Sequence, residues 1–469
     1  MSSKYSMQLI IVHAYEGRKS DNAPRPFLLI FESCSKTRLC YNVSMKIKVK
    51  KASYQEVEAI KKPEHKQPAR QTGLARFIMN TVARSELKAV NFRFEEVGME
   101  KLGAEEPALF LMNHSSFTDL NIAARILKKR QYHIVCTNDG FVGKNGLMRF
   151  LGCIPAKKFI NDLVLVKDMK YAIDKLGSSI LMYPEASYSF DGSETPLPGS
   201  LAKSLKLLKV PVVMIKTEGA FLRDPLYNCL QKRQVDVSST VTYLLSVDDI
   251  KNKSVEELDA VLTEAFRYDH FRAQKKAGIK VTEPFRADGL HRALYKCPAC
   301  LTEGKMTGKG IYVTCGKCGK QYELTEEGTL RATNGTTEYE YVTDWYKFER
   351  DSVREELLAH TYKTEMPVDI YILADTKAVY DVGSGILTHD ENGFVLKGCD
   401  GALEYVQSPK ESYSLYSDYY WYEIADVVSI GNTTRQYYCF PKNQDEAIVA
   451  KVRLATEELY KLSHAANKE

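Results

Sequence analysis

Short apolar runs alternate with amphipathic stretches between residues 108 and 246, and this alternation constrains the fold more than any other feature of the sequence. Five runs have the length and composition of buried strands: ALFLM, YHIVC, SSILMY, VPVVMIK and VTYLLSV. Between them, apolar side chains recur at helical spacing in residues 117–130, 164–176 and 200–209. Strands separated by helices of this length predict an α/β domain whose strands are joined by crossover helices.

The length of the chain predicts further domains. Its 469 residues correspond to roughly three domains of ordinary size. We assign four segments: an N-terminal extension and basic linker at 1–69, the α/β domain at 70–280, a small ribbon at 290–335, and an all-β domain with a C-terminal helix at 340–469. Whether residues 1–44 belong to the working protein is left open by the sequence.

Residues 340–469 have the pattern of an antiparallel β domain. About seven short strands with turn signals follow a charged helix, and a closing helix at 445–462 carries one apolar stripe. This pattern resembles the pleckstrin-homology-like architecture, which predicts a compact barrel or sandwich. The resemblance is one of topology, so it implies nothing about a ligand.

Composition narrows the compartment and the partners. No run approaches the ~18 apolar residues that span a bilayer, and no signal-peptide pattern is present. Four of the 11 cysteines form two C-x-x-C pairs and seven are scattered, which suits a reducing compartment. We therefore expect a cytoplasmic chain. The net charge of +5 hints at an anionic partner without choosing among lipid, nucleotide and nucleic acid.

Residues 73–88 predict an amphipathic helix. One face of this helix is apolar, comprising Leu74, Phe77, Ile78 and Val82, while the other sides carry the cations Arg76, Arg84 and Lys88. The apolar face could pack on the domain or touch a membrane surface. Packing is the expectation, because most amphipathic helices cover a core.

Two cysteine pairs with fourteen residues between them predict a metal site at Cys297, Cys300, Cys315 and Cys318. Four thiolates close a tetrahedral Zn²⁺ shell and leave no position for water, so the zinc is expected to be structural, with no catalytic cofactor elsewhere. A thioredoxin-like redox pair is disfavoured because two C-x-x-C units occur together, whereas an iron site remains open. Nucleic-acid binding by this ribbon is disfavoured, because its lysines lack a wider basic and aromatic face.

His114 precedes Asp119 by five residues where an apolar strand pattern gives way to a helical one. Inside one helix the two side chains would lie about 140° apart and would not meet. They can meet if His114 lies in the turn and Asp119 in the first helical turn, which Ser115 and Ser116 favour as capping residues. A carboxylate on one imidazole nitrogen leaves the other free as a base. The competing interpretation is a core histidine near an ordinary helix start.

Two later blocks favour the catalytic interpretation. YPEASYSFDG at 183–192 follows a predicted strand, and VPVVMI at 210–215 follows a predicted helix. Together with NHSSFTD, these blocks resemble, in order and spacing, those of the glycerolphosphate acyltransferase family, in its lysophosphatidic acid acyltransferase branch. The resemblance covers roughly residues 70–250.

This resemblance implies roles for individual residues. His114 would be the general base that deprotonates an acceptor hydroxyl, and Asp119 would orient it. The hydroxyl would then attack an acyl thioester directly, without an acyl-enzyme. Substrate-binding positions implied by these blocks are Asn113, Pro184, Glu185, Ala186 and Ser187. A further family block carries an arginine, near which LGCIPAKKFIND offers Lys157 and Lys158; these lysines could bind a phosphate or be ordinary surface residues.

The third block departs from the family pattern. Where the family has glycine, threonine and arginine after Pro-Glu, this chain has Ala186, Ser187 and Tyr188. A phenol cannot replace the bidentate charge with which a guanidinium clamps a phosphate. The reaction class is therefore better supported than the acceptor.

The leading hypothesis is an acyltransferase of phospholipid biosynthesis that uses acyl-CoA or an acyl-carrier protein as donor and a lysophospholipid as acceptor. With no spanning segment, it would reach substrate from the membrane surface, as a peripheral protein on the inner face. The alternative hypothesis is a non-catalytic lipid-binding or scaffold protein built on the same fold. Nucleic acid is the least favoured partner.

Overall fold

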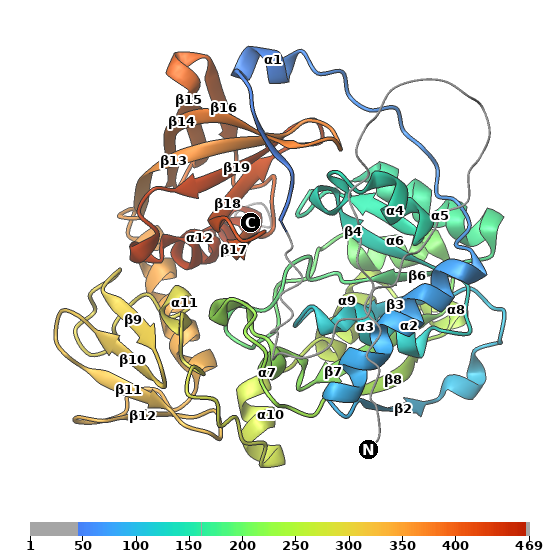
Figure 1. Cartoon of the computed structure of the whole chain (residues 1–469), viewed down its shortest axis with the longest axis horizontal. Helices are drawn as coiled ribbons and strands as arrows, with labels where there is room; N and C mark the ends of the chain where they lie inside the picture. Colours follow the sequence, from blue (N-terminus) through green and yellow to red (C-terminus); the bar gives the residue numbers. More distant parts are fainter. Residues whose placement is uncertain (1–45, 161, 466–469) are drawn as a thin grey trace, which may run out of the picture. The chain divides into compact units, whose positions relative to one another are not determined.

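The computed structural model describes residues 46–160 and 162–465, which form three β-sheets with flanking helices (Figure 1). The predicted extension at residues 1–44 lies outside the described residues. None of the helices in the described ranges combines the length and the apolar character that a bilayer crossing requires.

A seven-stranded sheet forms the α/β domain, in the order β2-β8-β7-β3-β6-β4-β5. Its strands are β2 (Arg93–Val97), β3 (Leu109–Met112), β4 (Tyr132–Thr137), β5 (Cys153–Ala156), β6 (Ser179–Met182), β7 (Val212–Glu218) and β8 (Ser238–Leu245). Strands β3 to β7 are parallel, and β2 and β8 run in the opposite direction. The five predicted strands are confirmed, whereas the short β2 and β5 are additional.

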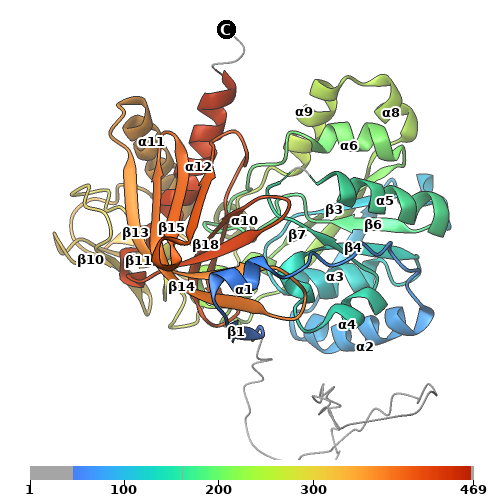
Figure 2. The same cartoon turned by 90° about the horizontal axis from the view of Figure 1, so that it is seen from above.

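Helices cover both faces of this sheet (Figure 2). One face carries α2 (Gly73–Ala89), α3 (Thr118–Ile126) and α4 (Asn145–Phe150); the other carries α5 (Leu163–Leu176), α6 (Leu201–Leu208), α8 (Val247–Asn252) and α9 (Val255–Ala265). The central strand serves both cores by alternation, since Phe110 and Met112 face one cluster while Leu109 and Leu111 face the other. Its fully apolar sequence follows from this double burial.

The exposed face of α2 corrects one expectation. Three of its four predicted packing residues lie in solvent, with Leu74 61%, Phe77 65% and Val82 48% exposed, while Ile78 is half-buried. The buried side chains are instead Ala75, Ala83 and Leu87. Small residues and one leucine bring the helix against the sheet, and the larger apolar residues project outward.

Two separate helices follow β8 and α8 along the chain. A capping box between Ser254 and Glu257 begins the first of them, α9. This helix ends at Ala265, and α10 (His270–Ala277) begins separately. The Asp269 side chain accepts the Arg272 N–H and caps this second helix, which gives the chain a local alternative to one continuous helix.

The cysteine pairs belong to a small antiparallel sheet in the order β12-β11-β10-β9. Its strands are β9 (Met306–Lys309), β10 (Tyr312–Cys315), β11 (Gln321–Leu324) and β12 (Leu330–Ala332). A long helix, α11 (Val342–Leu358), follows this sheet and leads into the C-terminal strands.

The C-terminal sheet agrees with the all-β prediction. Seven antiparallel strands take the order β16-β15-β14-β13-β19-β18-β17, and α12 (Ile448–Ala465) closes the described chain. The strands are β13 (Lys363–Leu373), β14 (Val379–Asp390), β15 (Gly393–Gly398), β16 (Leu403–Gln407), β17 (Tyr416–Trp421), β18 (Ala425–Gly431) and β19 (Gln436–Pro441). The pleckstrin-homology-like assignment stays a prediction.

Part of the predicted linker is ordered against this sheet. Strand β1 (Val49–Lys51) pairs in parallel with β14, and α1 (Tyr54–Glu58) follows with a capping box between Ser53 and Glu56. The side chains of β1 are exposed, as expected of a basic linker, but its backbone pairs with the C-terminal sheet.

Candidate active site

The buried strand β3 delivers the candidate catalytic turn. All four of its residues are buried, and the chain leaves it at Asn113 and enters α3 at Thr118. The Thr118 N–H donates to Ser116 Oγ at 3.0 Å, which helps to begin the helix. The five residues 113–117 therefore form the turn, and Asp119 falls in the first turn of α3, as the predicted geometry requires.

His114 and Asp119 form a hydrogen-bonded pair, with Nδ1 and Oδ2 3.0 Å apart. The same carboxylate oxygen accepts the backbone N–H groups of Ser115 at 2.7 Å and Ser116 at 3.1 Å. Asp119 is fully buried, so its position is set by these bonds. An Nδ1–H that donates to this carboxylate leaves Nε2 with a lone pair, which is the form of a general base.

Burial sets the protonation of this base. The pKa of His114 is lowered, first because burial disfavours the charged imidazolium, while Asp119 opposes the effect and the Lys158 charge adds to it. His114 is accordingly neutral near neutral pH. Its side chain keeps 17% of its surface exposed, so the ring is reachable from one side.

Two tyrosines contact the imidazole. Ring centroids lie 4.3 Å apart for His114 and Tyr183, and 4.1 Å apart for His114 and Tyr188. Phe117 extends this aromatic group, 5.2 Å from the Tyr188 ring. Tyr188, which stands where the family pattern has arginine, is therefore in direct contact with the candidate base.

Glu185 fixes the backbone of the catalytic turn. Its Oε2 accepts the His114 N–H at 2.9 Å, and its Oε1 accepts the Thr195 N–H at 2.9 Å and the Tyr268 hydroxyl at 2.8 Å. Burial raises its pKa to about 7, although these donors oppose the shift. Glu185 is fully buried and bonded to protein groups, an arrangement that positions His114. Its contact with substrate stays a prediction.

Asn113 links two neighbouring strands. Its Oδ1 accepts the Thr217 N–H at 2.7 Å, and its Nδ2 donates to the Thr217 carbonyl at 3.1 Å. The Asn113 side chain is fully buried, so these hydrogen bonds position the catalytic turn. Its contact with substrate stays a prediction.

The Pro184–Tyr188 turn brings the third block to the site. Ala186 has φ +56°, a left-handed conformation that favours glycine, and its N–H donates to the Tyr183 carbonyl at 3.0 Å. Ser187 Oγ donates to the Tyr188 carbonyl at 3.3 Å. This left-handed conformation explains why the family pattern has glycine at this position. The present chain adopts the same conformation with alanine.

Lys157 and Lys158 both reach the C-terminal sheet. Lys157 Nζ donates to the Thr433 carbonyl at 2.5 Å, and Lys158 Nζ lies 3.9 Å from the Tyr416 ring centroid. Burial lowers the pKa of both ammonium groups. The Lys158 charge is one of the causes that lower the pKa of His114. Phosphate binding by either lysine stays a prediction.

Residues from the C-terminal strands complete this region, and sequence reasoning did not find them. Asp139 Oδ2 accepts the Trp421 Nε1–H at 3.2 Å and the Tyr416 hydroxyl, and all three side chains are buried. Their separation along the chain leaves no local signal. The prediction for 340–469 assigned β17 to a separate all-β domain and did not include a contact between this strand and the active-site region.

A second buried acid adjoins the catalytic turn. Burial raises the pKa of Asp224 to about 8, because a hydrogen bond with Ser116 offsets only part of the desolvation. On the neighbouring residue, Ser115 Oγ lies 3.0 Å from His270 Nε2. Burial lowers the pKa of His270 to about 4, so this histidine is neutral. Asp224 and His270 therefore each contact a serine side chain of the catalytic turn.

The four cysteines of the small sheet meet at one point. Their sulfur atoms lie within 4.8 Å of one another, with Cys297 to Cys318 at 3.8 Å and Cys300 to Cys315 at 3.7 Å. A tetrahedral site with metal–sulfur bonds of about 2.3 Å has sulfur atoms about 3.8 Å apart. The cluster therefore fits a metal ion, and zinc is compatible with it.

Comparisons with known proteins identify a family for part of the α/β domain. Residues 93–216 match the family model described as Acyltransferase. One similar solved structure is the 1-acyl-sn-glycerophosphate (LPA) acyltransferase PlsC from Thermotoga maritima, at 17% identity, covering 41% of this chain and 76% of that one. The TM-score of this match is 0.30. No curated protein matches the chain. Through residues 93–216, the chain therefore carries a domain of the acyltransferase family.

Proposed function

We propose that this chain transfers a fatty acyl group from an acyl thioester to the hydroxyl of lysophosphatidic acid or a related lysolipid, in phospholipid biosynthesis. The donor thiol would be CoA or an acyl-carrier protein. The observation that carries the proposal is the His114–Asp119 pair, 3.0 Å apart at the end of β3 in an acyltransferase-family domain.

In the proposed reaction, His114 Nε2 removes the proton from the acceptor hydroxyl. The oxygen attacks the thioester carbonyl, and collapse of the tetrahedral intermediate breaks the carbon–sulfur bond. The departing thiolate then takes the proton from the imidazolium, so the products are an ester and a free thiol. Asp119 stabilises the imidazolium and keeps the ring in one tautomer. Glu185 and Asn113 hold the turn.

The acceptor is the less constrained substrate. Lys157 and Lys158 are the proposed phosphate contacts, and a phosphate would compete there with the C-terminal groups that the two lysines already contact. Tyr188 supplies no charge at the position where the family pattern has arginine. The acceptors to be tested, called the acceptor panel below, therefore include monoacylglycerol as well as lysophosphatidic acid and other lysophospholipids.

The remaining parts of the proposal concern cofactor and location. The ion bound by Cys297, Cys300, Cys315 and Cys318 is proposed to be structural zinc, because four protein thiolates leave no open coordination position. The protein is proposed to be cytoplasmic and to act at the inner face of the membrane, where lysolipid is presented. The exposed apolar residues of α2 support the membrane contact.

The experiment supplies the full chain with radiolabelled acyl-CoA or acyl-carrier protein and the acceptor panel, and measures labelled ester and released thiol. We expect His114→Ala to reduce turnover by about 100-fold or more. Turnover that is unaffected by this substitution would exclude the proposed base. Thiol release without ester would indicate thioester hydrolysis instead of transfer.

A second function, lipid binding without catalysis, is favoured by one observation. Tyr188 lies on the imidazole at 4.1 Å where the family pattern has a cation. A scaffold protein would bind lysolipid in the same experiment yet give no ester with any donor and acceptor. Retention of both His114 and Asp119 supports the enzyme over this candidate.

A further inference from the structure

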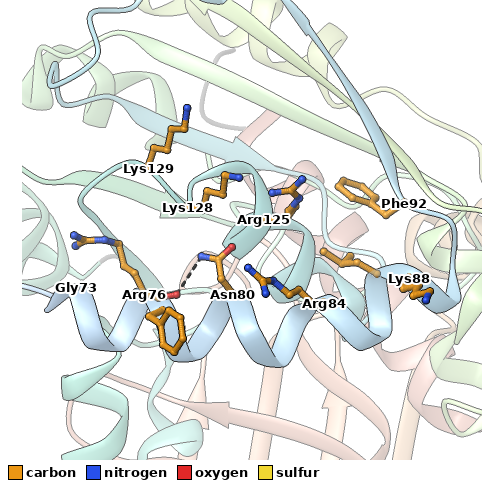
Figure 3. Close-up of a pocket in the computed structure, with 11 residues that line it drawn as sticks. Gly73, Arg76, Asn80, Arg84, Lys88, Phe92, Arg125, Lys128 and Lys129 are labelled. Carbon is orange, nitrogen blue, oxygen red and sulfur yellow. Dashed lines mark hydrogen bonds between the residues drawn. The ribbon is translucent and has the colours of Figure 1, made fainter. Parts of the chain in front are cut away.

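A cationic groove lies between α2 and the end of α3, on the opposite end of α3 from His114 (Figure 3). Its volume is about 700 Å³. One wall is a row of side chains along α2, and the other is formed by Phe92, Arg125, Lys128 and Lys129. The six cations that line it are Arg76, Arg84, Lys88, Arg125, Lys128 and Lys129.

The charge of this groove is not compensated within the described part of the chain. No aspartate or glutamate lines the groove, and none of the ion pairs among residues 46–160 and 162–465 involves its six cations. Arg76 is held by neutral oxygens, the Gln131 Oε1 at 2.5 Å and the Gln71 carbonyl at 3.3 Å. Six like charges around one cavity repel one another, so an anion bound in the groove would reduce this electrostatic repulsion.

The spacing of the cations fits more than one negative group. Lys88 follows Arg76 by twelve positions on one helix, with Arg84 between them, and twelve rises of about 1.5 Å give about 18 Å. Arg125 and the two lysines face them across the groove. A single small anion would meet only part of this row, whereas a multiply charged phosphate headgroup, or several headgroups, would meet all of it.

Exposed apolar side chains adjoin the cations on the same helix. Leu74 is 61%, Phe77 65% and Val82 48% exposed, and Phe77 also lines the groove. A soluble phosphoester would explain the cations but not these side chains. A bilayer surface explains both, because apolar residues enter the acyl boundary while neighbouring cations meet anionic headgroups.

We propose that the α2–α3 groove binds phosphate headgroups of anionic lipids in a bilayer, with the exposed face of α2 inserted beside them. The proposal rests on the proposed function only in choosing a membrane as the source of the phosphate. The groove would hold the protein on an anionic surface through a site separate from His114. Lipid composition would then control how much enzyme reaches its acceptor.

The test measures co-sedimentation of the full chain with vesicles of phosphatidylcholine alone, or of phosphatidylcholine with phosphatidic acid. We expect binding to the anionic vesicles that weakens as salt rises. The double substitution Arg84→Glu and Lys128→Glu should weaken it by about tenfold or more, since each surface cation contributes about fivefold. Phe77→Ser should weaken binding at every salt concentration, because it removes apolar insertion.

A matched control reverses two exposed lysines on other elements, Lys276 of α10 and Lys309 of β9, which changes net charge equally. Equal loss in this control would overturn the proposal, as would full binding by the groove variant or equal binding to neutral vesicles. Inorganic phosphate or CoA that binds the groove without vesicles, with the same dependence on Arg84 and Lys128, would assign it to a soluble ligand. His114→Ala should bind vesicles as the wild type does. Vesicle binding therefore tests the groove independently of the acyl-transfer proposal.

Discussion

The ring of Tyr188 lies against the ring of His114, with centroids 4.1 Å apart. Aromatic contacts of this kind contribute about 0.5–1.5 kcal/mol. Tyr188→Ala should release the imidazole from one side and lower kcat/KM by about two- to tenfold, while Tyr188→Phe keeps the ring and should stay near the wild-type value. The measurement is ester formation with one donor and one acceptor. An alanine variant as active as the wild type would mean that the contact does not orient the base.

The carboxylate of Asp119 predicts a change in both rate and pH profile. Asp119→Asn removes the charge that stabilises the imidazolium, so kcat should fall by about 100-fold or more. Because burial lowers the pKa of His114 and Asp119 opposes this, the wild-type acidic limb should lie below 6.5, and the asparagine variant should move it lower still. Activity in each case is lost as pH falls through the pKa of the base. An acidic limb that moves upward would contradict this assignment.

The sequence predicted the parts of this site that depend on local pattern. Apolar runs identified β3, and the spacing of His114 and Asp119 was compatible with a turn that the structure then confirmed at 3.0 Å. The cysteine pairs converged for the same reason, because each C-x-x-C is a local unit. The direct contact of Tyr188 with His114 had no such signal, since 74 residues separate them in the chain.

Features that depend on tertiary contact were missed or reversed. The periodicity of α2 shows that the helix is amphipathic, but it does not show which neighbouring element each face contacts. The face with the large apolar residues was therefore expected to pack, whereas the structure buries the small residues Ala75 and Ala83. Likewise, nothing near Asp139 indicated that it accepts hydrogen bonds from β17. Long-range pairing of this kind leaves no trace in a single sequence.

Asp224 predicts how stability depends on pH. Its pKa is raised by burial to about 8 in the folded protein, above the usual value of 3.8. The stability it contributes is therefore present below about pH 4 and lost as pH rises through 8. Asp224→Asn should be relatively more stable than the wild type at pH 9 than at pH 5, measured by urea unfolding. Asp400→Asn, at an exposed site, is the control, and an identical pH dependence in the two variants would contradict the prediction.

Metal removal should destabilise more than the small cysteine sheet. Cys297 and Cys315 belong to the same apolar cluster as Val368 and Leu459 of the C-terminal domain, whereas Phe110 of β3 belongs to a separate one. Chelation should therefore lower hydrogen-exchange protection in the cysteine sheet, α11 and the C-terminal strands, and less in β3 and β6.

Elemental analysis of the same sample should find about one zinc per chain before chelation. Cys315→Ser should reproduce the loss of protection, while Cys399→Ser, which is not one of the four clustered cysteines, should not. Uniform loss across the chain would indicate that the acyltransferase domain depends on the metal as well.

Ala186 offers a stabilising substitution at the edge of the active site. Its φ of +56° costs an L-residue about 1–2 kcal/mol, whereas glycine adopts it freely. Glycine also adds about 0.4–1 kcal/mol of entropy to the unfolded chain, so Ala186→Gly should raise the free energy of unfolding by about 0.5–1 kcal/mol. Ala277→Gly, at an exposed helical position of α10, should lower it by a similar amount. If both substitutions destabilise alike in urea titrations, Ala186 is not strained, and the glycine of the family pattern serves another purpose, such as close approach of substrate to the turn.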